Sequence, residues 1–146
     1  MNYKIKEENE QLKVYNEELD TLEDYVLISS KEWEYLNSIK NKYQRLTIED
    51  GKVKIVYRED IMLDDLKPLL IDLLKQNLKK YIYSVYPQDK QIDIVGRMFG
   101  YNDTDFEEMQ CFFNKMQDKY KEGKNKIMSC KIHSELLNIE LDFNGD

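Results

Sequence analysis

The side chains best suited to acid–base or nucleophilic chemistry are one histidine, His133, and two cysteines, Cys111 and Cys130. Histidine is the usual general base, and a cysteine beside it could act as a nucleophile. Such a pair needs a third group to orient the base, and the sequence identifies none. A zinc site lacks a second pair of ligands, and Cys130 and His133, three residues apart, would point to opposite faces of the strand expected there. We therefore expect no catalytic residue, no zinc and two free thiols.

Carboxylates are the remaining groups that could support chemistry. The stretch NDTDFEE, residues 102–108, is similar to the start of a calcium-binding loop, but Glu108 stands where that loop requires glycine. Acids at the start of a helix are favoured by its free N–H groups and its dipole, which also explains Asp64 and Asp65. The chain has no Gly-rich phosphate loop, no GxSxG and no HExxH. The sequence thus predicts a protein that is not an enzyme and needs no cofactor; a divalent metal held by distant carboxylates stays open as an alternative.

Negative charge is concentrated in three segments of a chain whose formal net charge is −7. Residues 1–24 hold eight acids and three lysines, and residues 103–108 and 135–146 each hold four acids and no base. Such a surface repels nucleic acid and anionic membranes and attracts basic partners. The same charge is also explained by solubility alone.

From this pattern we predict stoichiometric association with a protein partner that has a basic surface. The protein would act as an inhibitor or nucleic-acid mimic that occupies a basic nucleic-acid-binding surface, with its carboxylates replacing phosphates or forming ion pairs. Neither membrane binding nor direct nucleic-acid binding is expected. The predicted partner-binding residues are Glu7, Glu8, Glu17, Glu18, Asp20, Glu23, Asp24, Asp103, Asp105, Glu107 and Glu108.

A helix-turn-helix-like DNA-binding regulator is the main alternative. Residues 95–116 predict the end of a short helix, a glycine-centred turn at Gly100 and a second helix. Basic and aromatic residues around Lys52 could add a positive face. The start of the second helix is acidic, however, with no basic residue before Lys115, and would repel phosphates.

The elements that position these residues begin with an N-terminal helix. Ile5, Leu12, Leu19 and Val26 are seven residues apart, which predicts an amphipathic heptad helix over about residues 3–24, able to pair with a second copy in a coiled coil. We accordingly divide the chain into this acidic helix, residues 1–24, and an α+β domain, residues 25–146.

The α+β domain is expected to start with a strand, YVLIS, and a helix capped by Ser29 and Glu32 that buries Trp33. Asp50-Gly51 predicts a hairpin near residues 46–57. Residues 64–86 form the strongest helical pattern, with Pro68 in its first turn and Pro87 at its end. Further helices are expected over residues 88–99 and from residues 104–105, where Thr104 or Asp105 is the expected cap, to about Gly123.

The alternation of Leu137, Ile139, Leu141 and Phe143 predicts a C-terminal strand that pairs with one near residues 127–132. The expected fold is therefore a single compact α+β domain with about four to five helices and a small, mostly antiparallel sheet, preceded by the heptad helix. No apolar run of membrane-spanning length and no secretory signal occur, so we expect a cytoplasmic protein.

Overall fold

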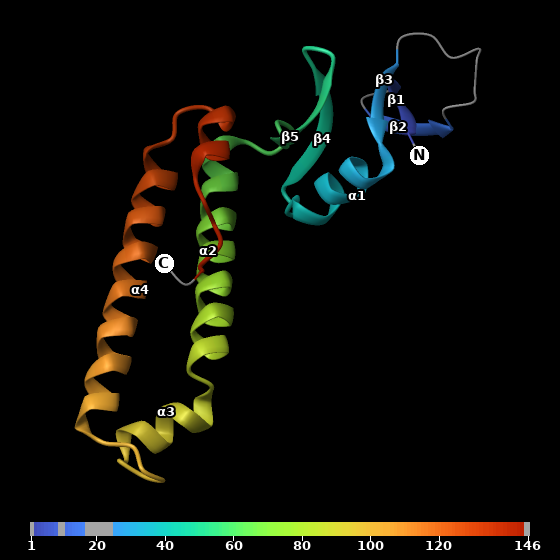
Figure 1. Cartoon of the computed structure of the whole chain (residues 1–146). Helices are drawn as coiled ribbons and strands as arrows, with labels where there is room; N and C mark the ends of the chain where they lie inside the picture. The colour runs from blue at the N-terminus through green and yellow to red at the C-terminus, as the bar shows by residue number, and fades with distance from the viewer. Residues whose placement is uncertain (1, 9–10, 17–24, 145–146) are drawn as a thin grey trace. The chain divides into compact units, whose positions relative to one another are not determined.

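The computed structural model describes residues 2–8, 11–16 and 25–144 and has the predicted α+β class. The chain divides into two compact units, Met1–Asp60 and Ile61–Asp146, in place of the single compact domain expected (Figure 1). The boundary expected after residue 24 stays a prediction. Within the described ranges, none of the helices has both the length and the apolar character needed to cross a lipid bilayer.

The first unit opens with an antiparallel sheet in the order β2-β1-β3, made of β1 (Asn2–Glu8), β2 (Gln11–Asn16) and β3 (Val26–Ser29). The predicted heptad helix is wrong for residues 2–8 and 11–16, and its remainder, residues 17–24, lies outside the described residues. Ile5 is fully buried and pairs with Val14 on one side and Val26 on the other. Apolar and polar residues in these segments also alternate with the period of two that a strand requires. Ile5 and Val26 of the seven-residue repeat therefore lie on neighbouring strands and not along one helix.

The predicted strand at residues 25–29 is confirmed as β3, and α1 (Ser30–Ile39) follows it directly. The Ser29 Oγ accepts a hydrogen bond from the Glu32 backbone N–H at 3.2 Å, as expected of the cap. Trp33 is only half-buried, and α1 has no fully buried side chain.

The predicted hairpin is confirmed as β4 (Gln44–Glu49) and β5 (Lys52–Tyr57). Asp50 and Gly51 have φ values of +52° and +72°, the left-handed pair that a two-residue type I′ turn requires. This turn fixes the register that pairs Leu46 with Ile55.

The second unit is a long helical hairpin with a short helix at its tip (Figure 1). It contains α2 (Leu63–Val85), α3 (Gln88–Val95), α4 (Asp103–Ser129) and a 3₁₀ helix, η1 (His133–Asn138). Pro68 lies in the second turn of α2, not in the first as expected. The buried side chains are four residues apart on α2 and seven and eleven residues apart on α4, which keeps them on one face of each helix, and α3 and η1 add one each: Leu66, Leu70, Leu74, Ile94, Met109, Met116, Ile127 and Leu136.

The two C-terminal strands predicted near residues 127–143 are wrong. Helix α4 continues through Gly123 to Ser129 because its buried face repeats to Ile127, and residues 139–144 form no strand. Without a strand at 127–132, the alternating C-terminal residues have no edge to pair with. The terminal segment instead lies along α2, where the Asn77 Nδ2 donates to the Leu141 carbonyl oxygen at 3.0 Å (Figure 1).

Candidate partner-binding surface

The predicted acidic residues lie in both units. Glu7 and Glu8 lie on β1, and the set at residues 103–108 lies on the first two turns of α4. Glu17, Glu18, Asp20, Glu23 and Asp24 lie outside the described residues. The structure thus gathers Asp103, Asp105, Glu107 and Glu108 on one helix end, which we call the α4 acidic turn.

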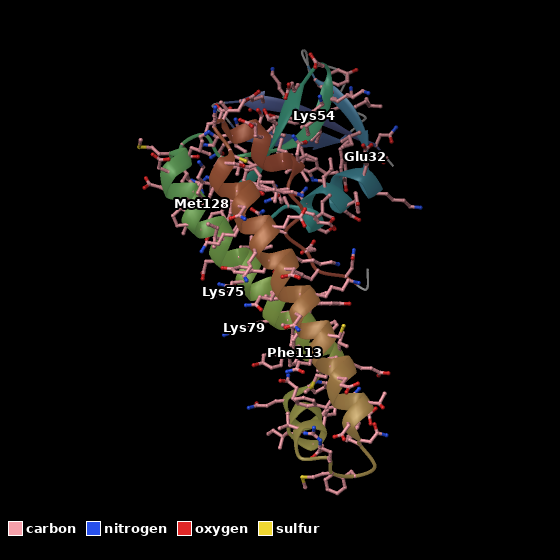
Figure 2. The ribbon with its side chains drawn as sticks, turned by 90° about the vertical axis from the view of Figure 1, so that its left-hand side faces the viewer. Glu32, Lys54, Lys75, Lys79, Phe113 and Met128 are labelled. Carbon is pink, nitrogen blue, oxygen red and sulfur yellow. The ribbon has the colours of Figure 1, made fainter. Side chains whose placement is uncertain are left out.

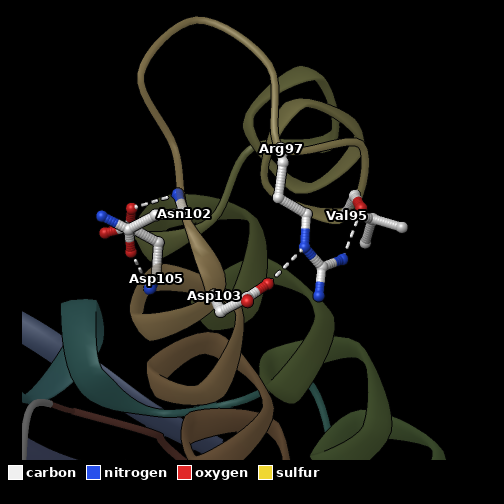
Figure 3. A network of polar contacts seen from close by, with 5 residues as sticks. All are labelled: Val95, Arg97, Asn102, Asp103 and Asp105. Atoms are coloured by element: carbon white, nitrogen blue, oxygen red, sulfur yellow. Dashed lines mark hydrogen bonds and ion pairs between the residues drawn. The ribbon is translucent and has the colours of Figure 1, made fainter.

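The start of α4 is fixed by Asn102, not by the cap expected at residues 104–105. The Asn102 Oδ1 accepts from the Asp105 backbone N–H at 3.1 Å, and the Asp105 Oδ2 accepts from the Asn102 backbone N–H at 2.8 Å (Figure 3). This reciprocal capping box satisfies two backbone donors that the helix leaves free. Asp105 therefore has a structural role. Asparagine three residues before an acid was the signal for this start.

Asp103 is paired with Arg97, which precedes α4 in the α3–α4 loop. The Arg97 Nε lies 2.9 Å from the Asp103 Oδ1, and its Nη1 donates to the Val95 carbonyl oxygen at 2.7 Å (Figure 3). The guanidinium also lies 4.4 Å from the centroid of the Phe106 ring. Sequence reasoning missed Arg97, because an arginine in a loop carries no sign of which acid it contacts.

Glu107 and Glu108 are the members of the α4 acidic turn that are exposed and have no hydrogen bond or ion pair to another described residue. They lie in the second turn, beyond the free N–H groups and beyond most of the helix-dipole effect. The charge of Glu108 reaches a neighbouring aromatic residue: burial raises the pKa of Tyr86, and the charges of Glu108 and Asp105 raise it further. A role in stabilising the helix terminus therefore does not account for Glu107 and Glu108.

In the first unit, Glu8 is engaged within its own sheet. The Lys13 Nζ lies 3.2 Å from the Glu8 Oε2, and the Tyr15 hydroxyl donates to the Glu8 Oε1 at 3.0 Å. The hydrogen bond from Lys13, followed by that from Tyr15, lowers the pKa of Glu8 below its ordinary value, and the contact with Glu8 raises the pKa of Tyr15. Glu7 is exposed on the neighbouring position of β1.

His133 and Cys130 each form a hydrogen bond with a backbone carbonyl oxygen. The His133 Nε2 lies 2.7 Å from the Ile61 carbonyl oxygen, so it carries the proton and donates. The Cys130 Sγ donates to the Lys126 carbonyl oxygen at 3.2 Å, and burial raises the pKa of this thiol, whereas Cys111 is exposed. Over residues 2–8, 11–16 and 25–144, no group of three or more His, Cys, Asp and Glu side chains is placed to hold a metal ion.

Comparison of the chain with protein-family models, with curated proteins and with solved structures finds no match. Any function proposed for this chain therefore rests on the chemistry of its described residues. Within the α4 acidic turn, Glu107 and Glu108 are exposed to solvent, whereas Asp103 is paired with Arg97.

Proposed function

We propose that this protein is a non-catalytic acidic binding protein that associates stoichiometrically with a protein partner carrying a basic surface. Its carboxylates replace the phosphates of nucleic acid, so that it acts as an inhibitor or mimic occupying a basic nucleic-acid-binding surface.

The observation that carries the proposal is the exposed pair Glu107 and Glu108 on the second turn of α4. Adjacent residues on a helix point in different directions, so the two carboxylates present negative charge over a broad part of the α4 surface, and no cation among the described residues forms an ion pair with either of them. A basic partner would supply the cations that these carboxylates lack. The helix end that carries the pair begins at the Asn102–Asp105 capping box, next to the Arg97–Asp103 ion pair.

The partner surface must also fit the rest of the chain's charge. The formal net charge of −7 makes long-range approach to a basic surface fast at low salt and slow at high salt. On the basic side of the first unit, the Arg58 Nε already donates to the Asp60 Oδ1 at 3.1 Å, which reduces the positive face available to DNA.

The test compares two charge-neutralising variants of equal size. Glu107→Gln/Glu108→Gln alters the proposed site, and Asp64→Asn/Asp65→Asn, in the first turn of α2, is the matched control in the same unit. Each protein is immobilised, host proteins are captured at low salt and eluted with a salt gradient, and every captured protein is identified and competed with duplex DNA. We expect a nucleic-acid-binding protein that elutes at moderate salt, is displaced by DNA, and binds the Glu107→Gln/Glu108→Gln variant several-fold more weakly.

Three outcomes contradict the proposal. The first is binding that does not change between low and high salt. The second is equal loss of binding in both variants. The third is retention of the native protein itself on a DNA column at moderate salt, which would favour a DNA-binding regulator.

A further inference from the structure

Four large apolar side chains are exposed together at the tip of the helical hairpin. Ile92 and Val95 on α3 are 57% and 53% exposed, and Met98 and Phe99 in the following loop are 45% and 82% exposed. Single exposed apolar residues are common, but a contiguous group marks an interaction site. We call Ile92, Val95, Met98 and Phe99 the α3 apolar patch.

The loop that presents Phe99 is held in an unfavourable backbone conformation. Arg97 and Phe99 have φ values of +51° and +53°, a region that residues with a Cβ avoid. Hydrogen bonds keep the loop there: the Met98 N–H donates to the Asp93 carbonyl oxygen at 2.8 Å, and the Tyr101 N–H donates to the Met98 carbonyl oxygen at 3.1 Å. The exposure of Phe99 is therefore built into the loop, and such strain is typical of functional positions.

Phe112 and Phe113 of α4 are packed against Tyr86, and Phe99 is not packed. Phe112 contacts Tyr86 with ring centroids 5.1 Å apart, and Phe113 contacts Tyr86 at 5.8 Å. Phe99 is the most exposed large apolar side chain among the described residues. Its apolar surface adds nothing to the core of the unit.

A shallow groove of about 230 Å³ lies between α2, α3 and α4, and none of the four patch residues lines it. It is lined by Lys79, Ile82 and Tyr83 of α2, Gln91 of α3 and Phe113 of α4. Gln91 lines the groove, and Val95 of the patch lies one turn further along the same face of α3. Figure 2 shows Lys75, Lys79 and Phe113 following one another along the hairpin in the direction of α3.

The charge around the patch identifies its occupant. Residues 88–108 contain six acids and two bases, and both bases are engaged: Lys90 lies over the Tyr86 ring and Arg97 pairs with Asp103. A second copy of this tip would bring the same negative charge, and an anionic membrane would be repelled. A protein surface with an apolar recess bordered by lysine or arginine complements both features.

We infer that the α3 apolar patch is the anchor of a protein–protein interface, with Phe99 inserted into an apolar recess of a partner whose basic border pairs with the α4 acidic turn. The inference rests on the proposed function for that basic border. Beyond the proposed function, it adds an apolar anchor, whose contribution to the binding affinity does not decrease at high salt.

The experiment uses peptides of defined chemistry as probes. Isotope-labelled full-length protein is titrated with an amphipathic helical peptide of leucine and lysine, a lysine–glutamine peptide of the same length and charge, and an uncharged leucine–glutamine peptide. We expect the leucine–lysine peptide to bind most tightly and to shift the amides of residues 92–99 and 103–108. Phe99→Ala should weaken this binding about tenfold, while Phe99→Leu restores most of it.

Met62→Ala is the matched control, because Met62 is also in this unit and is 70% exposed. Equal binding by Phe99→Ala and the native protein overturns the inference; if Glu107→Gln/Glu108→Gln still weakens binding, the proposed function survives. Loss of binding in Phe99→Ala with no effect of salt or of the glutamine variant supports the anchor and contradicts the proposed function. Phe99-dependent binding to zwitterionic vesicles, or Phe99-dependent dimerisation by sedimentation, would assign the patch to lipid or to a second copy and overturn the inference.

Discussion

Gly123 of α4 faces Leu74 of α2 so closely that an ideal Cβ on the glycine would lie 3.0 Å from the Leu74 Cδ2. Leu74 is 2% exposed, so its side chain has little room to move. The glycine therefore lets two long helices approach one another, and it does not end α4.

Gly123→Ala should destabilise the second unit by about 1 kcal/mol. Alanine gains about 1 kcal/mol of helix propensity over glycine, but the contact with Leu74 costs about 1–3 kcal/mol of overpacking. Denaturant unfolding followed by helical circular dichroism measures the change. In the Leu74→Ala background, the Gly123→Ala substitution should become stabilising, since the space is then available. Equal effects in both backgrounds would contradict the contact.

Glu8→Gln should destabilise the first unit at neutral pH but not in acid. The lowered pKa of Glu8 means that the folded unit favours its ionised form. This stabilisation is fully present above the ordinary glutamate pKa of about 4.3 and is lost as the pH falls through the lowered pKa. Trp33, the only tryptophan, lies in this unit, so its fluorescence during urea unfolding measures the difference at each pH.

The exposed neighbour Glu7 provides the control for this measurement. Glu7→Gln should leave the pH dependence of unfolding close to that of the native protein. A difference between Glu8→Gln and the native protein that persisted unchanged into strong acid would show that the glutamine acts through packing and not through charge.

Asn102→Ala should cost about 1 kcal/mol of stability in the second unit, because the Asp105 backbone N–H loses its acceptor. Asn102→Ser should retain most of that stability, since serine also caps helices. Chemical denaturation followed by helical circular dichroism checks both variants. Equal stabilities of the alanine and serine variants would show that the cap does not stabilise α4.

Local sequence signals predicted several elements correctly because their energetics are local. Asp50 and Gly51 adopt the left-handed turn that brings β4 and β5 together, and Ser29 caps α1 as expected. The repeat of Leu66, Leu70 and Leu74 matches one buried helix face, which the sequence shows without further information.

The candidate site was predicted in part. The acids at residues 103–108 were expected to be a partner surface, and the structure separates their roles: Asp103 and Asp105 are engaged in the α3–α4 loop and cap, and Glu107 and Glu108 are exposed. The α3 apolar patch was not predicted. In the sequence its residues cannot be distinguished from ordinary helix and loop positions. Only the tertiary structure shows which apolar side chains are buried and which are exposed.

The sequence alone determined the α+β class, the hairpin turn, the cap of α1 and the long amphipathic helix α2. Only the tertiary structure decided between helix and strand where the sequence pattern allowed both. Ile5 and Val26, which belong to the seven-residue repeat in the sequence, pair across a sheet. The alternating residues after Leu136 form no strand and lie along the helices. The physical reason is that a backbone strand needs a partner edge and an apolar side chain needs a surface to cover it, and both are supplied by residues distant in the chain.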